Sequence, residues 1–189
     1  MINRLGSIWR RDESHGFTLI ELMAVVSIIG LIAAIAIPLF VRHLRESKTS
    51  EAFLQLKILS ESASSYYQVD HYDENGLPYE ILMFPTSTGG ITDTTESFVP
   101  ATVPPGGKVD SSSDWVGSPW EDLKYFVAKP HYYQYRYQPD NVLEATFTAK
   151  ACGDLDGDGV TSLWRVEGVG NEDSVTLTPV IPDSANPYE

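Results

Sequence analysis

The chain has 189 residues, is 42% hydrophobic and carries a formal net charge of −13 at pH 7. This acidity argues against a surface that binds nucleic acid, because such binding depends on Lys and Arg contacts to phosphates. No direct nucleic-acid site is evident. The single cysteine, Cys152, excludes an intrachain disulfide and is expected to be a small buried residue.

An apolar segment occupies residues 17–41, and Glu21 is its only ionisable side chain. Its 25 residues exceed the about 20 that a helix needs to cross a bilayer core. A carboxylate near the start of such a helix costs about 2.5–3.5 kcal/mol in lipid. Glu21 therefore needs a partner, and the simplest one is an amino terminus created by cleavage just before Phe17.

The residues that carry this signal are Gly16-Phe17-Thr18-Leu19-Ile20-Glu21, preceded by a leader with three arginines. They resemble the class III signal of type IV pilins and of the related type II secretion pseudopilins. The resemblance implies that a prepilin peptidase of the inner membrane cleaves between Gly16 and Phe17 and methylates the Phe17 amine. It also implies that Glu21 meets the methylated amine of a neighbouring subunit during assembly.

Two other interpretations of the same segment remain open. A secretory signal could be cleaved after Ala34-Ile35-Ala36, although its apolar run would be unusually long. A plain membrane anchor would explain the length but would leave Glu21 unpaired in lipid. In either case the arginines of the leader favour a cytoplasmic start.

The apolar segment begins a longer predicted helix, residues 17–70, in which apolar side chains recur every three or four positions. At 1.5 Å per residue this helix would be roughly 80 Å long. Gly30 and Pro38 are weak points in it. By the resemblance, residues 30–38 can melt in the assembled fibre; a simple kink at Pro38 is the alternative. The expected domains are a leader (1–16), this helix (17–41 spanning the membrane or filament core), and a globular head (71–189).

The head opens with residues 71–122, which are rich in Gly, Pro, Ser, Thr and Asp. The long loop of residues 86–107 corresponds in position to the αβ-loop of pilins. Trp115 and Trp120 are expected to pin this region to the core. Strands are predicted at 124–128, 132–137, 143–149 and 161–167 from their composition and alternation. An antiparallel sheet packed on the long helix gives an α+β fold, the ladle fold of pilins.

An acidic loop follows the third predicted strand. Asp154, Asp156 and Asp158 alternate and Gly159 occupies the sixth position, as at the start of an EF-hand calcium loop. The twelfth position is Arg165, which excludes an EF-hand. A Ca²⁺ site between strands remains open, formed by these three carboxylates, the carbonyl of Val160 and a remote carboxylate such as Glu167.

The alternative to a calcium site is a hairpin turn built of Asp and Gly. In that case Arg165 or Lys150 would supply the compensating positive charge.

The expected function is that of a structural subunit that polymerises into type IV pilus filaments after leader cleavage and N-methylation. Such fibres support adhesion, motility or DNA uptake. The partners would be further copies of the chain, the prepilin peptidase and an inner-membrane assembly platform. The precursor would span the inner membrane once, and the product would be an extracellular pilus.

Two alternatives to this function stay open. The first is a pseudopilin of a type II secretion system, forming a periplasmic pseudopilus. The second is a membrane-tethered calcium-binding protein. An enzyme is not expected, because no metal-ligating His pattern, phosphate-binding loop or nucleophile elbow occurs.

Overall fold

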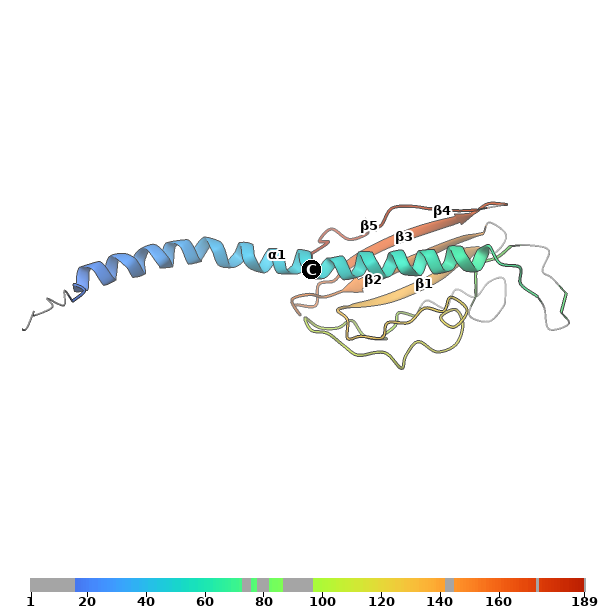
Figure 1. Cartoon of the computed structure of the whole chain (residues 1–189), viewed down its shortest axis with the longest axis horizontal. Coiled ribbons are helices and arrows are strands. Elements are labelled where there is room, and N and C mark those ends of the chain that lie inside the picture. Colours follow the sequence, from blue (N-terminus) through green and yellow to red (C-terminus); the bar gives the residue numbers. More distant parts are fainter. Residues whose placement is uncertain are drawn as a thin grey trace, which may run out of the picture. The chain divides into compact units, whose positions relative to one another are not determined.

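The computed structural model describes residues 16–72, 76–77, 82–86, 97–141, 145–172 and 174–188, with the side chains of 140 and 141 left out. Most of the predicted leader and part of the expected αβ-loop lie outside these ranges. The chain divides into two compact units, Met1–Val41 and Arg42–Glu189. One long helix is followed by an antiparallel sheet, which confirms the predicted α+β class (Figure 1).

The helix α1 runs from Leu19 to Tyr67, two residues later and three residues earlier than the predicted bounds. Within the second unit, the side of α1 that faces the sheet repeats every three or four residues, as the sequence predicts. Its buried members are Thr49, Ala52, Leu56, Leu59, Ser60, Ala63 and Tyr67. This apolar face forms one wall of the core of the head.

The other wall of the core is a five-stranded antiparallel sheet. Its strands are β1 (Tyr133–Asn141), β2 (Thr146–Gly153), β3 (Ser162–Gly170), β4 (Val175–Leu177) and β5 (Ile181–Pro182). The order is β1-β2-β3-β4, and β5 pairs with β3 beyond the short β4. The strands lie alongside the C-terminal half of α1 (Figure 1).

Alternation along the strands places large side chains in the core. Tyr133, Tyr135 and Tyr137 of β1 are buried, and so are Phe147 of β2 and Trp164 of β3. The period-2 pattern of the aromatic run, which predicts this burial, is therefore confirmed.

The sheet differs from the prediction at several places. Residues 124–128 form no strand: a turn ends at Lys124, whose φ is +52°, and the following residues are irregular. Tyr125 and Val127 in this segment are still buried, because they join the core from a loop. β1 continues through Pro139, which an edge strand tolerates because no amide is needed there.

The third predicted strand, residues 143–149, is shifted. β2 begins at Thr146, and residues 142–144 lie outside the described ranges. β4 and β5 were not predicted, because three and two residues are too short for an alternating pattern.

Two tryptophans anchor the loop that precedes the sheet, as predicted. Trp115 and Trp120 are 7% and 6% exposed, and their ring centroids are 4.8 Å apart in an edge-to-face arrangement. The loop is also tied to β1, because Val99 exchanges two backbone hydrogen bonds of 2.8 Å with Tyr135. Cys152 is a free, buried thiol, in agreement with the expectation.

Candidate functional site

The expected cleavage point lies just before α1. Gly16, Phe17 and Thr18 are not helical, and Phe17 is 86% exposed. The peptide bond between Gly16 and Phe17 is therefore outside the helix and uncovered by the described part of the chain. Its processing remains a prediction.

Glu21 and Thr18 together form a capping box at the start of α1. The carboxylate Oε2 of Glu21 accepts hydrogen bonds from the Thr18 amide (2.9 Å) and the Thr18 hydroxyl (2.7 Å). In return, the Glu21 amide donates to Thr18 Oγ1 at 3.3 Å. This reciprocal arrangement satisfies donors that the first turn of a helix leaves unpaired. This capping box was not predicted, although Thr-x-x-Glu before an apolar run is its usual sequence signal.

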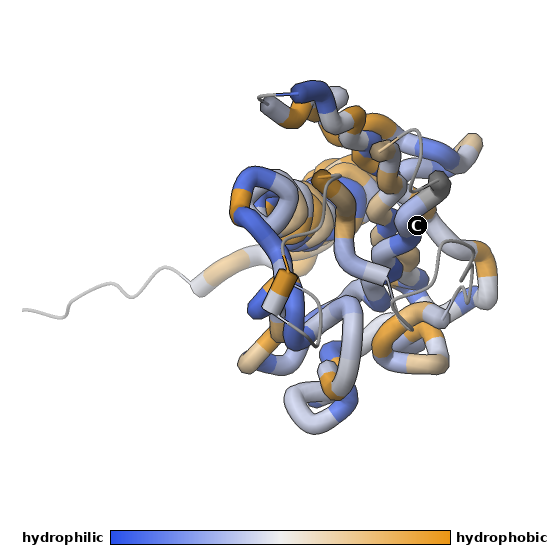
Figure 2. Tube along the Cα trace, turned by 90° about the vertical axis from the view of Figure 1, so that its right-hand side faces the viewer, coloured by the Kyte–Doolittle hydropathy of each residue, from blue (hydrophilic) through white to orange (hydrophobic). Residues whose placement is uncertain are grey.

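No described residue of the chain covers the apolar part of α1. Its large apolar side chains are between 42% and 75% exposed from Leu19 to Val41. In the described residues, α1 is long and apolar enough to cross a membrane by length and composition. In Figure 2 the N-terminal stretch of α1 has pale orange, apolar tones, whereas the turns of the helix nearest the viewer mix orange with blue. This surface requires lipid or other protein around it.

Gly30 and Pro38 both lie inside α1, which is assigned as helix across them. A Cβ added at Gly30 would meet nothing within 4 Å. Packing within one chain therefore does not require glycine at this position. The predicted melting of residues 30–38 concerns the assembled fibre and remains a prediction.

The acidic loop brings three carboxylates together. Oxygen atoms of Asp154, Asp156 and Asp158 lie within 4.8 Å of one another. Asp154 is 5% exposed, and its two oxygens accept the amides of Gly157 (2.6 Å) and Gly159 (3.0 Å). Both glycines have positive φ, +78° and +88°, which the tight turn requires. The geometry is thus that of a turn held by its own aspartates.

The positive charge beside this loop comes from α1. Arg45 Nη2 lies 2.6 Å from Asp156 Oδ2, and both side chains are about a quarter exposed, at 26% and 25%. The expectation that Arg165 or Lys150 would compensate the loop is wrong. Both of those side chains pair with Asp183, the residue directly after β5, at 3.5 Å and 3.2 Å.

Of the two further expected calcium ligands, Val160 and Glu167, only Val160 lies beside the acidic loop. The amide of Val160 donates to Asp158 Oδ1 at 2.7 Å, so Val160 stays beside the loop. Glu167 lies in β3, where its carboxylate accepts from Arg165 at 2.8 Å. Among the described residues, Glu167 is not part of the group of carboxylates close enough to share an ion.

Comparisons with known proteins agree with the N-terminal geometry. Residues 11–37 match the family described as the prokaryotic N-terminal methylation motif. The chain is 50% identical over 63 residues to a type IV major pilin protein, PilA, of Myxococcus xanthus, covering 33% of this chain and 29% of that protein. It is 51% identical over 44 residues to the fimbrial protein EcpB of Eikenella corrodens, covering 23% and 28%.

A third relative is a type IV major pilin protein, PilE1, of Neisseria gonorrhoeae, 40% identical over 52 residues, or 28% of this chain and 32% of that protein. Each of these matches spans about a third or less of the relative's length. No solved structure matches the chain.

The matched motif covers the capped start and much of the apolar part of the long helix α1. Over part of its length the chain is therefore similar to type IV major pilins and a fimbrial protein.

Proposed function

We propose that the chain is a structural subunit that polymerises into type IV pilus filaments after cleavage at Gly16 and N-methylation of Phe17. The observation that carries this proposal is the exposed apolar segment of residues 17–41, whose single carboxylate, Glu21, lies one turn from the expected new amino terminus. Such a helix is stable in a bilayer before assembly and among copies of itself afterwards. Adhesion, motility and DNA uptake would follow from the fibre.

In this proposal Glu21 changes partner on assembly. In the single chain it caps its own helix through Thr18. In the fibre it would pair with the methylated amine of a neighbouring Phe17, because an unpaired charge in an apolar core is costly. That pairing would set the axial register of the subunits. An inner-membrane platform and the prepilin peptidase would be the other partners.

Variants at Glu21 and Thr18 separate the charge from the cap. Glu21→Gln removes the negative charge but keeps a side chain that can close the capping box with Thr18. Thr18→Ala removes the cap and keeps the charge. We expect Glu21→Gln and Glu21→Ala to abolish sheared surface filaments, and Thr18→Ala to retain them. Cleavage after Gly16 should be unchanged in all three variants. Mass spectrometry of the subunit extracted from membranes measures this cleavage.

A filament yield of Glu21→Gln equal to that of the unaltered chain would contradict the charge pairing. Loss of cleavage in the same variants would instead place the defect before assembly.

The type II secretion pseudopilin remains the alternative within the same class, because the N-terminal geometry is expected for both. The three relatives reported above are two type IV major pilins and a fimbrial protein, which favours the pilus. The location of filaments decides between the two: a pilus extends from the cell surface, and a pseudopilus stays in the periplasm.

We further propose that the acidic loop takes a Ca²⁺ ion. The support is that three carboxylates converge within 4.8 Å, and that the side chains of Asp156 and Asp158 are accessible from solvent. Hard oxygen ligands of this kind suit Ca²⁺. Because Arg45 already lies against Asp156, an ion would compete with the guanidinium for that carboxylate. A tethered calcium-binding protein that does not polymerise is the remaining alternative.

A further inference from the structure

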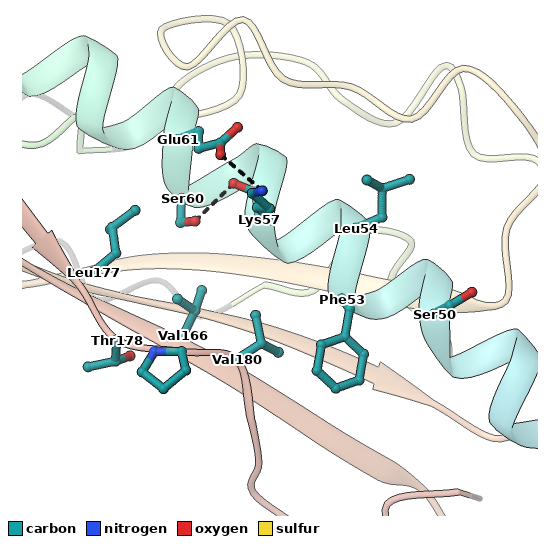
Figure 3. A pocket seen from close by; sticks show the side chains of 11 residues that line it. Ser50, Phe53, Leu54, Lys57, Ser60, Glu61, Val166, Leu177, Thr178 and Val180 are labelled. Atoms are coloured by element: carbon teal, nitrogen blue, oxygen red, sulfur yellow. Dashed lines mark hydrogen bonds and ion pairs between the residues drawn. The ribbon is translucent and has the colours of Figure 1, made fainter.

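An apolar groove runs along the second unit between α1 and the edge of the sheet (Figure 3). It has a volume of about 670 Å³. Phe53 and Leu54 line it from α1, and Leu177 and Val180 line it from the segment of β4 and β5. Figure 3 shows Phe53 projecting from the helix toward Val180, with Val166 of β3 at the floor.

The edge of the sheet leaves this groove open. β4 pairs with β3 over only three positions and β5 over two, so no long strand covers the space beside α1. Phe53 is 40% exposed and Leu54 is 58% exposed, although both lie beside a packed core. Apolar side chains gathered in a concave surface mark an interaction site more strongly than scattered ones do.

The groove carries no net charge. Its charged side chains are Lys57 and Glu61, which form an ion pair of 3.8 Å with each other. This neutrality is informative because the chain has a formal charge of −13, so most contacts between two copies would bring like charges together. A neutral apolar groove is a place where a second copy can approach without that repulsion.

The same chain offers a surface complementary to this groove. Residues 22–41 contain no ionisable side chain, and their large apolar side chains are left exposed by the described part of the chain. A groove on one part of a chain and a matching helix on another make a heterologous contact. Contacts of that kind generate open helical polymers when the rotation between copies does not close.

We propose that this groove receives the apolar helix, residues 22–41, of a second copy of the chain. The proposal rests on the proposed function. It adds a binding site for the neighbour's helix on the globular head. Burying apolar surface from both copies would stabilise the filament at a point separate from Glu21. The walls that contact the neighbour are Leu54 on α1 and Val180 beside β5.

The first test places a charge on each wall of the groove in the full chain. We expect Leu54→Lys and Val180→Lys each to lower the amount of sheared filament at least tenfold, with normal levels of cleaved subunit in the membrane. Val116→Lys is the matched control, because Val116 is 70% exposed and is not among the residues that line the groove. That control should assemble like the unaltered chain.

Filaments at the unaltered level from both groove variants would overturn the proposal. Absence of filaments from the unaltered chain would instead overturn the proposed function.

Disulfide crosslinking in assembled filaments tests the occupant directly and does not depend on a destabilised head. In a Cys152→Ala background, Leu54→Cys is combined with a cysteine at each position from 22 to 41 in turn. We expect crosslinked multimers at positions three or four residues apart, the period of one helix face. Filaments that form without a crosslink at any of these positions would show that the groove does not hold the neighbour's helix.

Discussion

Arg45 of α1 forms an ion pair with Asp156 of the acidic loop, 111 residues further along the chain. This pair supplies the positive charge that offsets the carboxylates of the loop. The pair is about a quarter exposed, so its net contribution to stability is modest, in the range of about 1 kcal/mol or less. Its larger effect concerns ions, because a guanidinium and a Ca²⁺ ion cannot both take the same lone pairs of Asp156.

We therefore predict that Arg45→Gln raises the affinity of the loop for Ca²⁺, from a starting range of about 10⁻⁴–10⁻³ M, typical of extracellular sites. Asp158→Asn should weaken binding. Thermal unfolding of the cleaved subunit, followed by tryptophan fluorescence in detergent with Ca²⁺ or with a chelator, measures both effects. If neither the unaltered chain nor Arg45→Gln shifts its unfolding temperature with Ca²⁺, the loop is only a turn.

At the scale of elements, the sheet depends on close contacts between glycines and aromatic rings. A Cβ built on Gly168 of β3 would lie 2.0 Å from Cε1 of Phe147, whose side chain is fully buried. Because this ring packs against Phe84 at a centroid distance of 4.8 Å, it has no free space into which to move.

Gly168→Ala is accordingly predicted to lower the free energy of unfolding by about 1–3 kcal/mol, the usual effect of overpacking. Gly107→Ala is the matched control, because its added Cβ has an ordinary contact of 3.9 Å with a backbone oxygen. Chemical denaturation of both variants measures the difference. Equal stability of the two would contradict the packing argument.

A second prediction at the scale of elements concerns residues 30–38 of α1. Pro38 removes one backbone hydrogen bond from α1, and Gly30 lowers helix propensity without any packing need inside the chain. We predict faster amide exchange across residues 30–38 in filaments than across 22–29, and slower exchange after Pro38→Ala. Uniform protection along α1 in the unaltered filament would favour a simple kink.

The sequence predicted the elements whose signal is local and missed those that depend on distant partners. The 3.6-residue period marked the buried face of α1, and the period-2 aromatic run marked β1. The Thr18–Glu21 cap was also local and could have been found from its spacing. Arg45 could not be matched to Asp156, because no pattern links a helix to a loop so far away. Residues 124–128 were mistaken for a strand because loop residues that enter a core, such as Tyr125 and Val127, show the same alternation.

At the scale of the whole molecule, the two compact units carry different tasks. The first presents an apolar helix that must be covered by lipid or by other copies, and the second presents an acidic head with one neutral groove. A chain built in this way is consistent with a subunit that is stored in a membrane and then added to a polymer. The matches to the three relatives named above each cover a third or less of the chain.

The most direct measurement of the central claim is the intact mass of the protein recovered from filaments sheared off the cell surface. The account predicts a chain that begins at Phe17 and carries one added methyl group, in a high-molecular-weight fraction. A chain that still begins at Met1, or one that begins at Ile37, would contradict it. The first result would indicate a membrane tether and the second a freely secreted domain.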